Sequence, residues 1–107
     1  MAKIRAIVKR TDEQYGHVTN ISSTLKNLQK LVDGPIEVTS ITDDTVILCN
    51  EEGKLRNLPK NFIKSAGFPF SDVIVGDIVV VGVEGEEFTD CPLDFATWKW
   101  LLKSWGN

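Results

Sequence analysis

Six amide and cationic side chains crowd a short stretch in the middle of the chain, and they are the residues best suited to chemistry. They are Asn50, Lys54, Arg56, Asn57, Lys60 and Asn61. Amides and cations together can recognise a carboxylate, a phosphate or the edge of a nucleobase. The segment therefore predicts a binding site for a small anionic ligand. The alternative is that Asn50 and Asn61 only bond to nearby backbone groups and cap turns.

The charge of this region is open to two interpretations. Residues 54–71 carry four cations and no acid: Lys54, Arg56, Lys60 and Lys64. Either they form a local patch that attracts anions, or they lie in solvent along an edge strand and discourage it from pairing with the edge of another sheet. The whole chain has a net charge of −3, so non-specific binding to nucleic acid is not expected.

No residues in the sequence have the spacing of a catalytic or metal-binding constellation. The single histidine, His17, follows a glycine and has no nucleophile or metal ligand at a suitable distance in sequence, which favours a structural or exposed role. The pairs at 43–44 and 86–87 are adjacent acids in turns, where neighbouring side chains point in opposite directions. We expect no enzymatic activity, no metal and no cofactor.

A second candidate surface is apolar. Trp100 lies about 200° around a helix from Trp98, so it points away from the predicted buried stripe. A tryptophan that faces solvent is often part of an interface, here beside the acidic segment from Glu84 to Asp94. The alternative is that Trp100 packs against the loop that carries Phe68 and Phe70.

Length and composition indicate one folded domain over residues 1–107. The chain is 42% hydrophobic and 25% charged, as is usual for a globular protein. Cys49 and Cys91 belong to no cysteine cluster, and buried free thiols are expected. The N-terminus does not resemble a signal peptide, and the apolar run at 78–81 is too short to span a bilayer. We expect a cytoplasmic protein without membrane contact.

The first third of the chain predicts two strands and a helix. Apolar residues alternate from Ala2 to Lys9, residues 11–16 read as a loop, and His17 to Ile21 is a short strand. A helix follows with Ser22 or Ser23 as its N-cap, and it ends at Gly34, which precedes a proline.

The rest of the chain predicts further antiparallel strands and a C-terminal helix. Strands are expected at 36–41 and 45–49, the latter pairing with 54–58 in a hairpin closed by a turn at 50–53. Residues 60–71 suit a loop or short helical turn, and residues 72–83 return to strand with a turn or bulge at 76–77. Pro92 is expected to open an amphipathic C-terminal helix. The fold class is α+β, with a small, mostly antiparallel sheet.

Four stretches together resemble a known family. They are LQKLVDGPIE at 28–37, VILCNEEGKL at 46–55, LPKN at 58–61 and IVGDIVVVG at 74–82. This pattern is similar to a domain-of-unknown-function family of short proteins from phages, plasmids and integrated elements, mostly of Gram-positive bacteria. The resemblance spans about residues 24–90, so Trp100 stands outside it. It implies a mobile-element accessory protein in a bacterial cytoplasm. It does not imply any particular enzymatic activity.

Two functional hypotheses follow. The first is a non-enzymatic accessory binding protein of a phage or mobile element that modulates the host, as an anti-defence protein does, by sequestering a small anionic, nucleotide-like ligand at residues 50–61. The second is a protein–protein interaction module or inhibitor of a host protein, which uses Trp100 and the acidic surface.

Overall fold

The main sheet has six strands. Five of them lie side by side, and the sixth, which is short, pairs with the central one. The computed structural model describes residues 3–65 and 71–107. Along the sheet the order is β2 (His17–Ser22), β1 (Lys3–Lys9), β7 (Ile78–Glu84), β4 (Thr45–Asn50) and β3 (Ile36–Thr42), and β8 (Glu87–Thr89) also pairs with β7. Each of these pairs is antiparallel. The expected α+β class with antiparallel sheets is confirmed.

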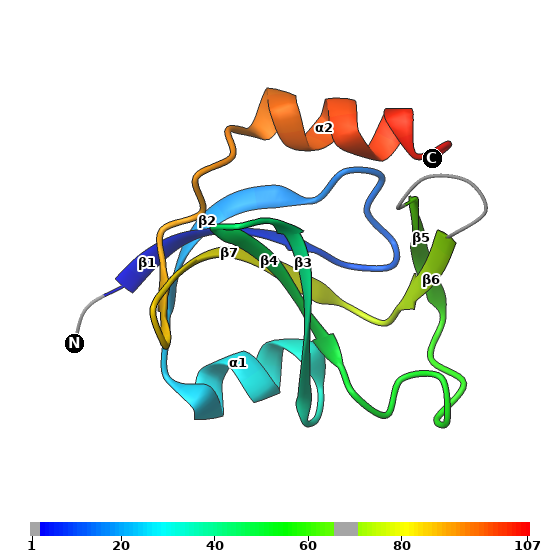
Figure 1. The fold of residues 1–107 in the computed structure, drawn as a ribbon. Helices are drawn as coiled ribbons and strands as arrows, with labels where there is room; N and C mark the ends of the chain where they lie inside the picture. Colours follow the sequence, from blue (N-terminus) through cyan, green and yellow to red (C-terminus); the bar gives the residue numbers. More distant parts are fainter. Residues whose placement is uncertain (1–2, 66–70) are drawn as a thin grey trace.

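Two helices and a small ribbon cover the sheet. Helix α1 (Leu25–Val32) lies against one face and α2 (Phe95–Ser104) lies on the other side (Figure 1). Strands β5 (Lys60–Ser65) and β6 (Ser71–Val75) form a separate two-stranded antiparallel ribbon. It packs through Phe62 and Ile74 into the same core as α2. The protein is therefore layered, with apolar cores on both faces of the sheet.

Strand β7 explains why the sequence carries an unbroken apolar run. Val79 and Val81 join the core beneath α1, whereas Ile78 and Val80 join the core beneath α2 and the ribbon. All four side chains are fully buried, because successive residues of a strand point to opposite faces and here both faces are covered. Strand β7 is therefore a central strand that is buried on both faces.

Helix α1 begins and ends close to the predicted positions. The N-cap is Thr24, not Ser22 or Ser23, because the Thr24 hydroxyl accepts a bond from the Asn27 amide at 3.3 Å. Asp33 adopts the left-handed conformation that ends the helix, with φ of 62°. Gly34 is needed for close packing, since a Cβ there would lie 2.7 Å from the Asn50 side-chain nitrogen.

The predicted hairpin between residues 45–49 and 54–58 is wrong. Strand β4 pairs instead with β3 and β7, and residues 51–57 form consecutive turns. The buried strand β7 offers β4 a larger apolar contact than the charged segment 54–58 does. The turn at Asp43 and Asp44 forms as expected, and it joins β3 and β4 in an antiparallel hairpin. Residues 60–65 are strand β5 and not the predicted loop or helical turn.

Helix α2 starts at Phe95, three residues after the predicted start at Pro92. Its N-cap is Asp94, whose carboxylate accepts a bond from the Thr97 amide at 2.7 Å. The preceding segment is held to the sheet, since the Cys91 amide donates to the Arg5 carbonyl at 2.8 Å. Trp98 and Leu102 form the buried face of the helix.

An aromatic cluster joins α2 to the β5–β6 ribbon. Trp98 meets Phe62 edge-on at 5.6 Å between ring centroids, and Trp105 stacks on Phe62 at 6.1 Å. The Trp98 indole N–H donates to the Tyr15 carbonyl at 2.8 Å. The large buried ring of Trp98 and this hydrogen bond together hold α2 in place against the core.

Replacing Trp98 by alanine is expected to lower the free energy of unfolding by about 3–5 kcal/mol, because a fully buried ring leaves a cavity. Trp100→Ala is the matched control and should change it by no more than about 0.5 kcal/mol, as is usual for exposed positions. Urea unfolding followed by circular dichroism measures both. Equal losses for the two variants would contradict this packing.

Candidate functional site

The six amide and cationic residues of the predicted ligand site do not gather around one cavity. Two of them, Asn50 and Lys54, line one open pocket. The Asn50 amide and Arg56 contact the end of α1, and Asn61 lies between β1 and the turn before β7. Asn57 adopts a positive φ of 54° within the turns, and Lys60 is exposed at the start of β5.

Asn50 and Arg56 bind the C-terminal end of α1. The Asn50 side-chain nitrogen donates to the carbonyls of Val32 and Asp33 at 3.1 and 2.9 Å, and its oxygen accepts from the Glu52 amide at 2.7 Å. Arg56 donates to the Asp33 carbonyl at 2.6 Å and to the Asp33 carboxylate at 3.0 Å. The last carbonyls of a helix lack partners within it and carry negative charge, so an amide and a cation stabilise them. Asn50 is only 3% exposed.

Asn61 holds three separate backbone segments together. Its side-chain nitrogen donates to the Lys9 carbonyl at 2.9 Å and to the Gly76 carbonyl at 2.8 Å. Its side-chain oxygen accepts from the Lys9 ammonium, which also lies 5.8 Å from the Phe62 ring centroid. Burial lowers the pKa of Lys9, although Glu13 raises it in part. The polar atoms of the Asn61 side chain are thus engaged within the fold, by segments that are distant in sequence and not by a local turn.

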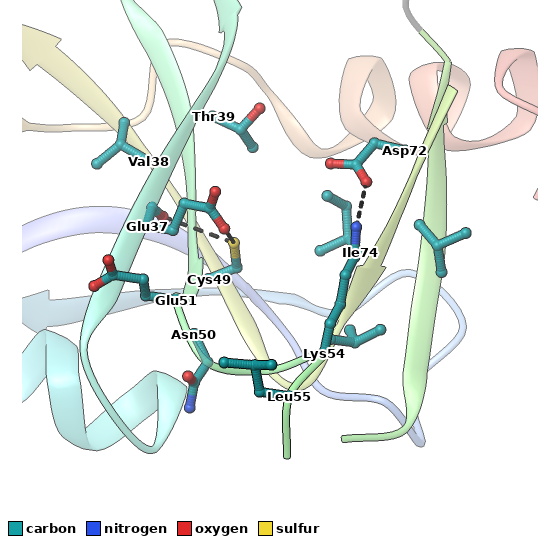
Figure 2. Close-up of a pocket in the computed structure, with 12 residues that line it drawn as sticks. Glu37, Val38, Thr39, Cys49, Asn50, Glu51, Lys54, Leu55, Asp72 and Ile74 are labelled. Carbon is teal, nitrogen blue, oxygen red and sulfur yellow. Dashed lines mark hydrogen bonds and ion pairs between the residues drawn. The ribbon is translucent and has the colours of Figure 1, made fainter. Parts of the chain in front are cut away.

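Lys54 lines a cavity of about 300 Å³ between β3 and β6. Figure 2 shows Glu37 and Cys49 on the β3–β4 side and Lys54 reaching to Asp72 on the β6 side. The Lys54 ammonium lies 2.7 Å from the Asp72 carboxylate, and this hydrogen bond and the charge of Asp72 raise the pKa of Lys54. The positive charge of Lys54 is therefore already paired with the Asp72 carboxylate.

The charge of this cavity is negative. Its walls contain three carboxylates, from Glu37, Glu51 and Asp72, and one cation, Lys54. Burial, followed by the nearby Glu37 carboxylate, raises the pKa of the Cys49 thiol to about 11. The thiol is therefore protonated near neutral pH and is a poor nucleophile. Like charges make such a cavity unfavourable for an anion.

Trp100 is exposed to solvent over 66% of its surface. Its neighbours on the outer side of α2 are the exposed Thr97, Lys103 and Ser104. The helix contains two lysines and no acid. The predicted orientation of Trp100 away from the core is correct. The alternative contact with Phe68 and Phe70 involves residues outside those that the structure describes.

The acidic segment from Glu84 to Asp94 is partly committed to the fold. Asp90 accepts a bond from the Arg5 amide at 2.7 Å, and Asp94 caps α2. The charges nearest to Trp100 along its helix are Lys99 and Lys103, whose ammonium groups each lie 5.6 Å from the Tyr15 ring centroid. The surface around Trp100 on α2 is therefore basic, and the four-residue spacing of these lysines was the signal for it in the sequence.

His17 has an acidic neighbour. Its Nδ1 lies 2.9 Å from a Glu13 carboxylate oxygen, at the start of β2. Within the described parts of the chain, no group of three or more histidine, cysteine, aspartate or glutamate side chains is placed to hold a metal ion. None of the helices in residues 3–65 and 71–107 has the length and apolar character needed to cross a bilayer.

Comparison with known proteins gives one match. A family model described as a domain of unknown function, DUF3846, matches residues 4–102. No curated protein and no solved structure matches the chain. The match extends well beyond the region of about 24–90 in which the resemblance was seen, and it includes Trp100. The expected membership of a domain-of-unknown-function family is confirmed.

Proposed function

Because the chain belongs to the DUF3846 family, a domain of unknown function, we propose a function from its surface: it is a non-enzymatic binding protein that docks another protein through α2. The observation that carries this proposal is the 66% exposure of Trp100. The proposed setting is that of an accessory protein of a phage or mobile element, acting on a host protein in the bacterial cytoplasm. The resemblance of four sequence stretches supports this setting.

The surroundings of Trp100 suit a docking surface. Ala96, Thr97 and Ser104 flank it on the exposed side of α2, and their small side chains leave the indole ring standing free. Tryptophan is enriched among the residues that dominate binding energy when a partner buries them. Its backbone is held in place by the buried Trp98 and Leu102 on the opposite side of the helix. A rigid helix thus presents the ring at low entropic cost.

The partner surface is proposed to be acidic. Lys99 and Lys103 contact the Tyr15 ring, and neither forms an ion pair with a carboxylate of the described residues. Carboxylates on a partner would therefore meet two cations that need no rearrangement of existing ion pairs. Such complementarity selects partners and raises the rate of association.

Sequestration of a small anionic, nucleotide-like ligand at residues 50–61 has less support. Of the cations there, Lys54 is paired with Asp72 and Arg56 with Asp33. An anion would have to displace these carboxylates, and the gain from a new ion pair would largely offset the loss of the old one. The protein-docking function is therefore preferred.

Photocrosslinking from position 100 tests the docking function. We expect Trp100→p-benzoylphenylalanine, expressed in a bacterial host, to give a discrete adduct with one protein whose crosslinked surface is acidic. Lys103→Glu in the same background should weaken the adduct several-fold, because it repels the carboxylates. Immunoblotting and mass spectrometry read both outcomes.

The matched control places the same photoreactive residue at Gln29, an exposed position on α1. It should give no such adduct. Absence of any adduct from position 100, or an equal adduct from both positions, would contradict the proposed docking surface.

Calorimetric titration with cyclic and ADP-ribose-type nucleotides separates the two functions. We expect no binding heat, because Lys54 and Arg56, two of the three cations of residues 50–61, already have carboxylate partners. Arg56→Ala provides the control. A saturable heat in the parent protein that Arg56→Ala removes would restore the anionic-ligand hypothesis and displace the preferred one.

A further inference from the structure

The cavity between β3 and β6 lies along an unpaired strand edge. Four successive residues of β6, 72–75, line it. Side chains of a strand alternate between its two faces, so a cavity that touches four in a row runs along an edge of the strand and not over one face. Among the described strands, β6 pairs only with β5, which leaves its other edge without a partner.

Exposed apolar side chains lie at this cavity. The described residues include six large hydrophobic side chains that are exposed, and Leu55 at 88% and Val73 at 41% are among the residues that line it. Leu55 comes from the turns after β4 and Val73 from β6. Val38 of β3 also borders the cavity, but its side chain points to the other face of the sheet (Figure 2). Large apolar residues brought to one place from separate elements are typical of a binding surface.

We infer that this cavity binds an extended peptide segment of a partner, which adds to β6 as a third strand of the β5–β6 ribbon. A two-stranded ribbon is a marginal structure without further packing, and an added strand would bond to the free N–H and C=O groups of the β6 edge. The four lining residues of β6 span about 13 Å, room for a segment of similar length. Trp100 is not part of this surface.

The charge of the cavity determines which kind of peptide sequence it would bind. Asp72 has Lys54 as its partner, but neither Glu37 nor Glu51 forms an ion pair within residues 3–65 and 71–107. Two carboxylates without an ion pair, beside the exposed side chains of Leu55 and Val73, fit a segment in which lysine or arginine alternates with an apolar residue. Alternation places its cations on one face of the added strand and its apolar side chains on the other.

Fluorescence anisotropy with labelled heptapeptides tests this inference. The probes are acetylated VKVKVKV, its acidic counterpart VEVEVEV, and VKVKVKV in which every backbone nitrogen is N-methylated. VKVKVKV is expected to bind saturably, VEVEVEV to bind much more weakly, and the N-methylated peptide to lose binding because it cannot donate backbone hydrogen bonds. Hydrogen exchange of the β6 amides should slow in the presence of VKVKVKV.

The paired variant Glu37→Gln with Glu51→Gln should weaken VKVKVKV binding several-fold. Glu86→Gln, at an exposed position in the turn between β7 and β8, is the matched control and should leave it unchanged. No saturable binding of VKVKVKV at millimolar concentration would overturn the inference, and so would equal binding of the N-methylated peptide. Self-association seen in sedimentation, if VKVKVKV reversed it, would replace the peptide partner with a second copy of the chain.

Discussion

The buried amide of Asn50 is the contact on which the arrangement of this protein depends. It joins the last carbonyls of the helix α1 to the end of the strand β4, 17 and 18 positions further along the chain. A helix of eight residues is too short to be stable alone, so it relies on tertiary packing and on partners for its terminal groups. Asn50 supplies those partners at the point where the chain leaves the sheet. The turns at 51–57 follow from there and carry the chain to β5.

This constraint also explains the second layer on the far side of the sheet. After the turns, β5 brings Phe62 to Trp98 and Trp105, and Asn61 ties it to β1 and to the turn before β7. Because β5 is fixed there, β6 faces β3 across the cavity, and among the described strands it pairs only with β5. The open cavity is thus a consequence of how the chain passes from one face of the sheet to the other.

The elements that could be predicted are those whose signal is local. The apolar run of β7, the turn at Asp43 and Asp44, and the Gly34-Pro35 end of α1 all appear in the sequence as patterns over a few residues. The false hairpin at 45–58 arose because a four-residue turn signal is the same whether a return strand follows or not. Strand β5 was missed because its sequence, KNFIKS, has only two apolar residues and little alternation.

The candidate site also contains features that could be predicted from the sequence and features that could not. The exposure of Trp100 followed from helical geometry, since its angle from the buried Trp98 is fixed by the helix. The groups to which Asn50, Asn61 and Arg56 donate could not be predicted, because they belong to residues between 15 and 52 positions away. Residue types suited to ligand recognition are equally suited to capping backbone groups, and only the fold decides between the two uses.

The central claim is that the amide of Asn50 serves the fold and not a ligand. Urea unfolding of Asn50→Ala measures it most directly, with the exposed Lys60→Ala as control. We expect Asn50→Ala to lose about 2–3 kcal/mol of unfolding free energy, since the buried Val32 carbonyl loses its donor and the Asp33 carbonyl keeps only Arg56. Lys60→Ala is expected to lose no more than about 0.5 kcal/mol. An Asn50→Ala protein as stable as the parent would contradict the claim.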